Sequence, residues 1–210
     1  FAYSAEENDL SKAIDSLFDN REGRPGCAVG VINNGKYIHK RGYGLANLEH
    51  NISIDENSIF RIGSISKQFT AMAIAILEEK GLLAFDDEMQ KHIPDLIDYG
   101  EEVTINQMIH HFSGLGDYED MDYPGRFRNA VDEEFRWGNE DYLTNEEFYA
   151  LIKTLPLIRK PERKFWYSNT GYALLALVAQ NISGLSLREL AEREIFNPLE
   201  MNDTFFNDDV

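Results

Sequence analysis

The chain has 210 residues, a formal net charge of −17 and hydrophobic residues at 43% of its positions. This length and apolar fraction are enough for one large domain or two small ones, each with a buried core. The excess of Asp and Glu argues against nucleic acid or an anionic membrane as a partner, because like charges repel. The apolar runs are shorter than a membrane span requires, so we expect no membrane-spanning segment.

Two features bear on the cellular compartment. The single cysteine, Cys27, cannot form an internal disulfide and is predicted to be a small core residue. Residues 1–5 carry no initiator methionine and resemble the small-residue end of an export signal. We therefore expect a periplasmic or secreted protein, with the cytoplasm as the alternative.

The first part of the chain is predicted to hold one helix and two strands. Apolar residues at helical spacing predict a helix over residues 10–18. The Val- and Ile-rich run 27–32 predicts a strand, Asn33-Asn34-Gly35 predicts a hairpin turn, and residues 36–46 are the returning strand. Because an isolated hairpin is only marginally stable, we expect these strands to belong to a larger antiparallel sheet.

The rest of the chain is predicted to be mainly helical. Residues 117–143, rich in acidic, glycine and aromatic residues, are predicted to form an irregular loop or a small insertion. Ser186 and Glu189 have the spacing of a capping box at the start of a helix. Apolar periodicity, caps and breakers predict helices at residues 67–79 (ended by Gly81), 86–93, 104–111, 145–155, 170–182 and 186–196.

A serine and a lysine, Ser64 and Lys67, stand three residues apart where a loop leads into the predicted helix 67–79. Residues at this spacing lie on one face of a helix. A serine attacks only when a base takes its proton, and an amine whose charged form is poorly solvated can serve as that base. Free N–H groups at the helix start can stabilise an oxyanion. The pattern alone also fits a helix hydroxyl and a surface amine.

A second polar pair, Tyr167 and Asn169, precedes the predicted helix 170–182. An ammonium beside a phenol lowers its pKa, so Tyr167 can accept the proton of Ser64 and return it to a leaving group. Asn169 offers a donor and an acceptor to a substrate amide or ester. The structural alternative is a tyrosine packed in the core and an asparagine that caps the next helix.

Together these motifs resemble the serine β-lactamase and penicillin-binding-protein superfamily. The similar segments are residues 60–70, 111–115, 167–172 and 197–204. A Tyr-x-Asn second motif, in place of Ser-x-Asn, resembles the branch that holds class C β-lactamases, D-Ala-D-Ala carboxypeptidases and related esterases. The resemblance implies an α/β (α+β) β-lactamase-like fold, in which an antiparallel sheet with flanking helices is joined to a mainly helical subdomain.

The resemblance also implies a role for each site residue. Ser64 is the acylated nucleophile and Lys67 is its proton partner. Tyr167 is the proton shuttle and Asn169 a substrate ligand. Whether Lys67 or Tyr167 is the base stays open at this point. Tyr118 follows a Ser-Gly-Leu turn that lines the cleft in similar proteins, so it is expected to contact the substrate.

The expected subdomains are residues 1–80, the first part of the sheet subdomain with the nucleophile helix, and residues 81–210, the mainly helical one. Members of the superfamily carry a third motif, Lys-Thr-Gly or His-x-Gly, on a late strand that supplies a second oxyanion N–H. These 210 residues do not contain that motif or the strands around it. We therefore expect either a fragment of a larger hydrolase or a chain completed by another chain.

No metal or cofactor is expected. His110 and His111 are neighbours in a predicted helix, so their side chains point apart, and His111 is expected to pack beneath the site. A group of acidic residues lacks the glycine and the distal glutamate of a calcium-binding loop and is interpreted as a solvated surface. That group comprises Asp117, Glu119, Asp120 and Asp122.

The leading hypothesis is a serine hydrolase that acts on an ester or amide through an acyl-enzyme. Esterase or D-amino-acid peptidase activity is favoured over dedicated β-lactamase activity, because the similar branch consists mostly of generalists. The alternative is a non-catalytic penicillin-binding or scaffold module with the same fold. The expected partner is a small-molecule or peptide substrate with an ester or amide bond, and the oligomeric state is open.

Overall fold

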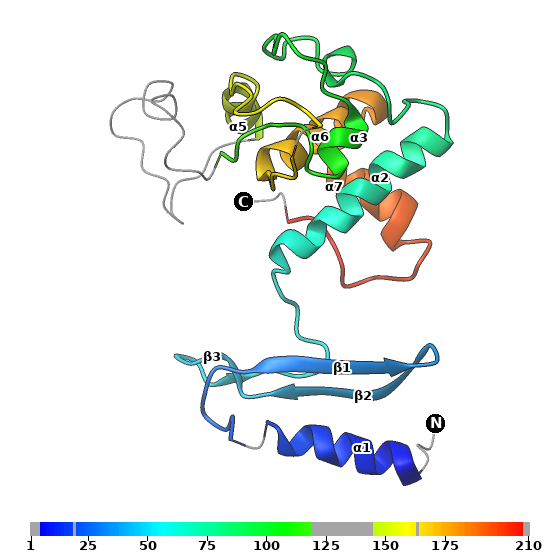
Figure 1. Ribbon diagram of the computed structural model, residues 1–210. Helices are drawn as coiled ribbons and strands as arrows, with labels where there is room; N and C mark the ends of the chain where they lie inside the picture. The colour runs from blue at the N-terminus through cyan, green and yellow to red at the C-terminus, as the bar shows by residue number, and fades with distance from the viewer. Residues whose placement is uncertain (1–4, 19, 119–144, 163, 208–210) are drawn as a thin grey trace. The chain divides into compact units, whose positions relative to one another are not determined.

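The computed structural model describes residues 5–18, 20–118, 145–162 and 164–207 (Figure 1). The chain divides into two compact units, one of residues 1–61 and one of residues 62–210. The helix that follows Ser64 therefore belongs to the second unit. The predicted boundary between residues 80 and 81 divides the sheet subdomain from the helical subdomain of a complete β-lactamase-like fold. That boundary stays a prediction.

Where the structure describes it, the first unit contains one helix and two small antiparallel sheets. Strand β1 (Cys27–Asn33) pairs with β2 (Lys36–Tyr43), and β3 (Leu45–Asn47) pairs with β4 (Ile52–Ser53). Helix α1 (Ala5–Ser16) contacts β2. In Figure 1 the β1–β2 hairpin is the longest strand pair of this unit. The predicted helix, hairpin and antiparallel pairing are confirmed, although α1 begins earlier and ends earlier than predicted.

The turn of the hairpin follows directly from its sequence. Asn34 and Gly35 have φ values of 50° and 74°, the left-handed pair that a two-residue turn of type I′ requires. Asn33 and Lys36 close the turn as partners across the ladder. The returning strand is shorter than predicted, because Gly44, at φ 72°, separates β2 from β3. A Cβ at that position would lie 2.6 Å from the carbonyl oxygen of Arg24, so only glycine fits.

Polar contacts join α1 to β2. The Ser11 hydroxyl and Nδ1 of His39 lie 2.8 Å apart, and Nε2 of His39 lies 2.8 Å from the Tyr43 hydroxyl. Tyr43 in turn donates to Asp15 at 2.7 Å, and Arg41 also donates to Asp15. His39 is buried, so these hydrogen bonds satisfy a polar group that would otherwise be costly to bury. Cys27, predicted to be a core residue, is half-buried at the start of β1.

The second unit is helical and is organised around α6 (Asn169–Ser183). This helix packs against α2 (Lys67–Glu79), α3 (Ile105–Ile109), α5 (Asn145–Ile152) and α7 (Leu187–Ala191), as Figure 1 shows. Shorter helical turns within the described residues are η1 (Gly63–Ser66), η2 (Met89–Lys91) and the π-helical turn η3 (Glu192–Phe196). The core includes the fully buried side chains of Ile74, Leu77, Met108, Leu174, Leu175 and Leu190.

Local signals account well for the helix ends. Helix α2 occupies the predicted residues, and Gly81 follows it at φ 70°. The Gly81 N–H donates to the Glu78 carbonyl at 2.8 Å and the Leu82 N–H to that of Leu77 at 3.0 Å, the two bonds of a Schellman motif. The predicted capping box of Ser186 and Glu189 is present at the start of α7. Thr104, the first residue of the predicted helix 104–111, also forms a capping box, with Gln107.

One predicted helix is wrong. Residues 86–93 form only the short turn η2, because their backbone groups bind a neighbouring segment instead of the helical partner. The Met89 N–H donates to the Val103 carbonyl at 2.8 Å, and the Ile105 N–H donates to the Asp87 carbonyl at 3.1 Å. The predicted helix 186–196 is present as α7 followed by η3. The predicted loop 117–143 lies outside the described residues from position 119 onward.

No single helix among the described residues combines the length and apolar character needed to cross a bilayer. One bent pair, Asn169–Ser183 with Leu187–Phe196, meets that criterion only when the two are counted together.

Candidate active site

Ser64 lies in the turn η1, which continues directly into α2. The turn begins at Gly63, which has φ 54°. Lys67 is the first residue of α2, and its Nζ donates a hydrogen bond to Ser64 Oγ at 3.1 Å. The predicted shared face of these two residues is confirmed. Ser64 is exposed and Lys67 is half-buried, so the hydroxyl is open to a substrate while the ammonium lies behind it.

Tyr167 also contacts Ser64. Its hydroxyl donates to Ser64 Oγ at 2.6 Å, across 103 positions in the chain. The next residue, Ser168, is buried and caps α6 by accepting the Gly171 N–H at 3.1 Å. The Ser168 hydroxyl also donates to the Gly116 carbonyl at 2.9 Å. These two bonds fix the segment that carries Tyr167.

Asn169 is the first residue of α6. Lys67 Nζ donates to its Oδ1 at 2.5 Å, and its own backbone N–H donates to Oδ2 of Asp117 at 2.9 Å. The structural alternative for Asn169 is therefore wrong, because Ser168 is the residue that caps the helix. Lys67 thus connects the nucleophile to the first turn of α6.

The Lys67 ammonium also faces two aromatic rings. Its Nζ lies 4.8 Å from the ring centroid of Tyr167 and 5.5 Å from that of Tyr172. Burial raises the pKa of the Tyr167 phenol, but hydrogen bonds with Lys67 and Ser64 and the charge of Lys67 lower it more, so the pKa lies below its ordinary value. The direction is the one expected for a phenol beside an ammonium.

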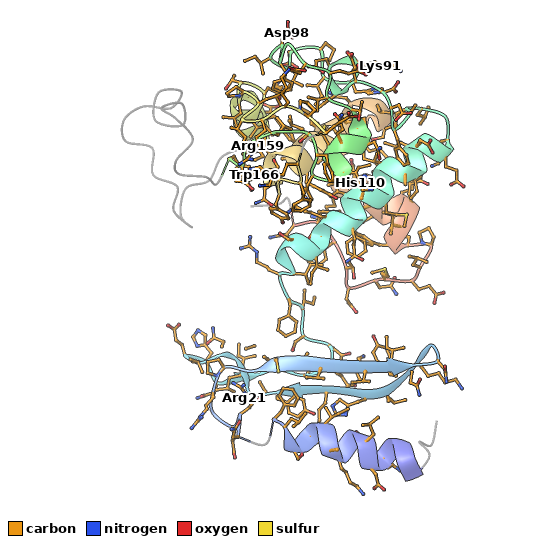
Figure 2. The ribbon with its side chains drawn as sticks, viewed as in Figure 1. Arg21, Lys91, Asp98, His110, Arg159 and Trp166 are labelled. Atoms are coloured by element: carbon orange, nitrogen blue, oxygen red, sulfur yellow. The ribbon has the colours of Figure 1, made fainter. Side chains whose placement is uncertain are left out.

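The segment before Tyr167 is held by further contacts. The Trp166 N–H donates to the His111 carbonyl at 2.8 Å. The guanidinium of Arg159 stacks over the Trp166 ring, 4.1 Å from its centroid, and Figure 2 labels both residues. Tyr167 is therefore positioned both by the helix cap that follows it and by the packed tryptophan that precedes it.

The arrangement can activate a serine. Ser64 Oγ lies within hydrogen-bond distance of two groups, Lys67 Nζ and the Tyr167 hydroxyl, and either can take its proton once it has lost its own. Ser64 also lies in the first helical turn of η1 and α2, where backbone N–H groups lack a partner within the helix. Which of the two groups is the base stays open.

Tyr118, the fifth predicted site residue, packs in a different direction. Its ring meets Phe148 of α5 edge-on, with 5.0 Å between the centroids, and its backbone N–H donates to the Thr170 hydroxyl at 2.9 Å. Its contact with a substrate stays a prediction. Of the acidic group, Glu119, Asp120 and Asp122 lie outside the described residues. Within the described ranges, no group of three or more His, Cys, Asp and Glu side chains is arranged to hold a metal ion.

The sequence predicts no chemical role for two residues near the site, His111 and Asp117. It predicts only that His111 packs beneath the site, and the His111 ring lies 4.6 Å from that of Tyr167. The sequence places Asp117 only within a solvated acidic group, yet its carboxylate accepts the backbone N–H of Asn169, the first residue of α6. A carboxylate at a helix N-terminus is a common stabilising contact, but nothing in the sequence indicates a pairing 52 positions apart.

Comparison with known proteins decides the family. The Beta-lactamase family model matches residues 14–210. The chain belongs to the Beta-lactamase family. Penicillin-binding protein 4* of Bacillus subtilis (strain 168) is 31% identical over 172 residues, which are 81% of this chain and 35% of that protein. Protein flp of Staphylococcus aureus (strain MRSA252) is 28% identical over 206 residues, 95% of this chain and 39% of that protein.

Solved structures confirm the β-lactamase-like fold. The octameric penicillin-binding protein homologue from Pyrococcus abyssi superposes with a TM-score of 0.73 at 31% identity, covering 93% of this β-lactamase-family chain and 43% of that chain. At the level of fold alone, EstCE1, a hydrolase with promiscuous acyltransferase activity, matches with a TM-score of 0.78 at 22% identity. That match covers 94% of this chain and 53% of the EstCE1 chain. A class C β-lactamase, again a likeness of fold alone, has a TM-score of 0.70 at 24% identity, and the match covers 95% of this chain and 50% of that chain.

The family assignment confirms the predicted superfamily and its fold of helices with antiparallel strands. The chain spans well under half the length of the two curated relatives above, 35% and 39%.

Proposed function

We propose that this chain carries the acylation centre of a serine hydrolase, which cleaves an ester or amide through an acyl-enzyme on Ser64. The observation that supports the proposal is the pair of hydrogen bonds at Ser64 Oγ, from Lys67 Nζ at 3.1 Å and from the Tyr167 hydroxyl at 2.6 Å. A nucleophile needs a base within hydrogen-bond reach, and here two candidates meet that condition.

The proposed reaction has two stages. Lys67 or Tyr167, in its unprotonated form, takes the proton of Ser64 while Oγ forms a bond to the substrate carbonyl carbon. The tetrahedral oxyanion then collapses, the bond to the leaving group breaks, and the leaving group receives the proton from the same pair of residues. In the second stage, water gives a proton to the same pair of residues as its oxygen bonds to the acyl carbon. The bond from that carbon to Ser64 Oγ then breaks, Oγ takes up the proton, and the carboxylic acid product leaves.

Lys67 has a second task in this scheme. Its ammonium lies between Ser64 and Asn169, which it contacts through hydrogen bonds, and it also faces the Tyr167 ring. A positive charge in this position favours the phenolate form of Tyr167, which is the form that accepts a proton. Proton acceptance at Tyr167 is thus coupled to the charge on Lys67.

The surroundings favour a small substrate with an apolar acyl group. Ser64 is exposed, its neighbour Ile65 is 61% exposed, and Phe165, two residues before Tyr167, is 55% exposed. Such exposed apolar side chains can be covered by an acyl chain or ring. Asn169 is the proposed ligand of the substrate amide or ester, with Tyr118 as a further candidate. The proposed class of reactions includes the hydrolysis of esters, of D-amino-acid peptides and of β-lactams.

Covalent labelling tests the proposal. A fluorophosphonate probe should label the wild-type protein, and Ser64→Ala should abolish labelling. Ser66→Ala is the matched control, because Ser66 lies in the same helical turn but carries none of the contacts described for Ser64 Oγ, and it should be labelled like wild type. A parallel reaction with a fluorescent penicillin shows whether β-lactams are among the substrates. A wild-type protein that neither probe labels would support the non-catalytic scaffold instead.

A further inference from the structure

Helix α3 ends with a histidine in the left-handed conformation. The His111 N–H donates to the Met108 carbonyl at 3.2 Å and the Phe112 N–H to the Gln107 carbonyl at 2.7 Å. These are the two bonds of a Schellman motif, and they place His111 at the position that takes a left-handed conformation. Its φ is 62°.

The same motif ends α2, where the corresponding residue is Gly81. Glycine adopts positive φ without steric cost, whereas a residue with a Cβ does not. A histidine at this position therefore stores backbone strain next to the candidate site, and strain of this kind is typical of positions whose side chain has a task.

The contacts of His111 connect it to the segment that carries Tyr167. Its carbonyl accepts the Trp166 N–H at 2.8 Å, and its Nδ1 accepts the Ser168 N–H at 3.2 Å. Between these two residues lies Tyr167, whose ring centroid is 4.6 Å from that of His111. One residue thus contacts three consecutive residues through its carbonyl, its ring nitrogen and its ring face.

Neighbouring aromatic rings hold the imidazole in place. The ring of Tyr172 lies 5.1 Å away, and that of Phe165 lies 5.6 Å away in an edge-on arrangement. The Tyr172 hydroxyl donates to the carbonyl of Ile109, the last residue of α3, at 2.9 Å. The end of α3 and the start of α6 are thereby joined around His111.

We propose that His111 is a positioning residue, which holds the Tyr167 hydroxyl against Ser64 by fixing residues 166–168 through its carbonyl, Nδ1 and ring. The proposal deepens the function proposed above and rests on it for the rate effects. A tyrosine that shuttles a proton must stay within hydrogen-bond distance of the serine, and a displacement of about 1 Å at a reacting group can cost about 100-fold in rate.

The proposal requires a neutral imidazole. Nδ1 can accept the Ser168 N–H only when it carries no proton, so the proton of the ring lies on Nε2. Burial lowers the pKa of His111, and the charge of Lys67 lowers it further. His110 acts in the same direction and Asp117 opposes it. The neutral form thus also avoids a second positive charge beside Lys67.

Two substitutions distinguish the contribution of the His111 ring from that of its Nδ1 acceptor. His111→Phe keeps an aromatic ring and removes the acceptor, and His111→Asn keeps an acceptor and tolerates positive φ but lacks the ring. His110 provides the matched control. It is exposed, its Nδ1 lies 2.9 Å from the Asn106 carbonyl, and Figure 2 shows it at the end of α3.

The kinetic readout is hydrolysis of a p-nitrophenyl ester. His111→Phe should lower kcat by about 10- to 100-fold with KM within about twofold, because the loss affects the position of Tyr167 and not substrate contacts. His111→Asn should recover part of that loss, which a role limited to ring packing would not allow. His110→Phe and His110→Asn should stay within about twofold of wild type. Equal effects at positions 110 and 111 would refute the proposal.

A readout independent of turnover completes the test. In wild-type protein, the ¹⁵N chemical shifts of His111 should show an unprotonated Nδ1 and a protonated Nε2. The phenol of Tyr167, followed by ¹³C NMR, should titrate at a higher pH in His111→Phe, because the ring would leave Lys67 and Ser64. An unchanged titration, or a protonated Nδ1, would overturn the role of His111. A failure of wild type to react with the ester or the fluorophosphonate would instead overturn the proposed function.

Discussion

The pair Lys67 and Tyr167 should behave as a single unit in the activation of Ser64. Both groups meet the same oxygen, at 3.1 Å and 2.6 Å, and the Lys67 ammonium contacts the Tyr167 ring as well. Removal of a general base costs about 10²- to 10⁴-fold in rate. Lys67→Ala and Tyr167→Phe should therefore each raise the activation free energy of acylation by about 2.7 to 5.4 kcal/mol, since a tenfold change in rate corresponds to about 1.36 kcal/mol.

The double variant distinguishes a unit from two independent groups. If the groups acted separately, the losses would multiply to about 10⁴- to 10⁸-fold, whereas residues that act as a unit lose little more in combination than the worse single variant loses. The assay is the rate of covalent labelling by a fluorophosphonate, measured for the wild type, both single variants and the double variant.

Tyr172 supplies a matched control for this cycle. Its ring also faces Lys67, at 5.5 Å, but its hydroxyl donates to the Ile109 carbonyl. Tyr172→Phe keeps the ring that faces Lys67 and removes only this hydroxyl, so it should slow labelling far less than Tyr167→Phe does. Fully additive losses for Lys67 and Tyr167 would refute the reasoning, because they would mean that the two groups do not share one proton path.

Three further predictions concern stability and pH. Leu175→Ala in α6 should lower the free energy of unfolding by about 2 to 5 kcal/mol, because the side chain is fully buried. Leu199→Ala, at a 65% exposed position, should change it by less than about 0.5 kcal/mol. Urea titrations measure both, and equal losses would contradict the core described above. Ser186→Ala should cost about 0.5 to 2 kcal/mol through the lost capping box, and an unchanged urea midpoint would show that the cap is dispensable. Burial lowers the pKa of His111 from its ordinary value of 6.5, the charges of Lys67 and His110 lower it further, and Asp117 opposes them, while the rings of Tyr167 and Tyr172 also face the imidazole. The contribution of His111 to stability is therefore present above about pH 6.5 and is lost as the pH falls toward the folded-state pKa. Wild type should then lose more stability than His111→Asn between about pH 7.5 and about pH 5, and parallel losses in urea titrations at the two pH values would contradict that assignment.

Elements set by local signals could be predicted from the sequence. Helix α2 follows from apolar periodicity and from Gly81, and the hairpin turn follows from Asn34 and Gly35, whose positive φ values few other residues adopt readily. Residues 86–93 could not be predicted in this way. Their hydrogen bonds go to Val103 and to Ile105, so contacts with a neighbouring segment override the local helical preference.

The candidate site divides in the same way. Ser64 and Lys67 are close in sequence, and Tyr167 and Asn169 have a recognisable spacing, so all four could be named in advance. His111 could be placed only beneath the site, because its contact with Ser168 joins positions 57 residues apart. Its left-handed conformation could not be predicted either, because the sequence predicts a helix through residue 111, where the structure has a Schellman motif.

The most direct test of the central claim is the position of the acyl group during turnover. The protein is mixed with p-nitrophenyl acetate, quenched in acid before the ester is exhausted, digested and mapped by mass spectrometry. The account predicts one acetyl group on Ser64, and no stable acetylation in Ser64→Ala. An acetyl group found instead on Ser66, Lys67, Tyr167 or Ser168, with Ser64 unmodified, would contradict it.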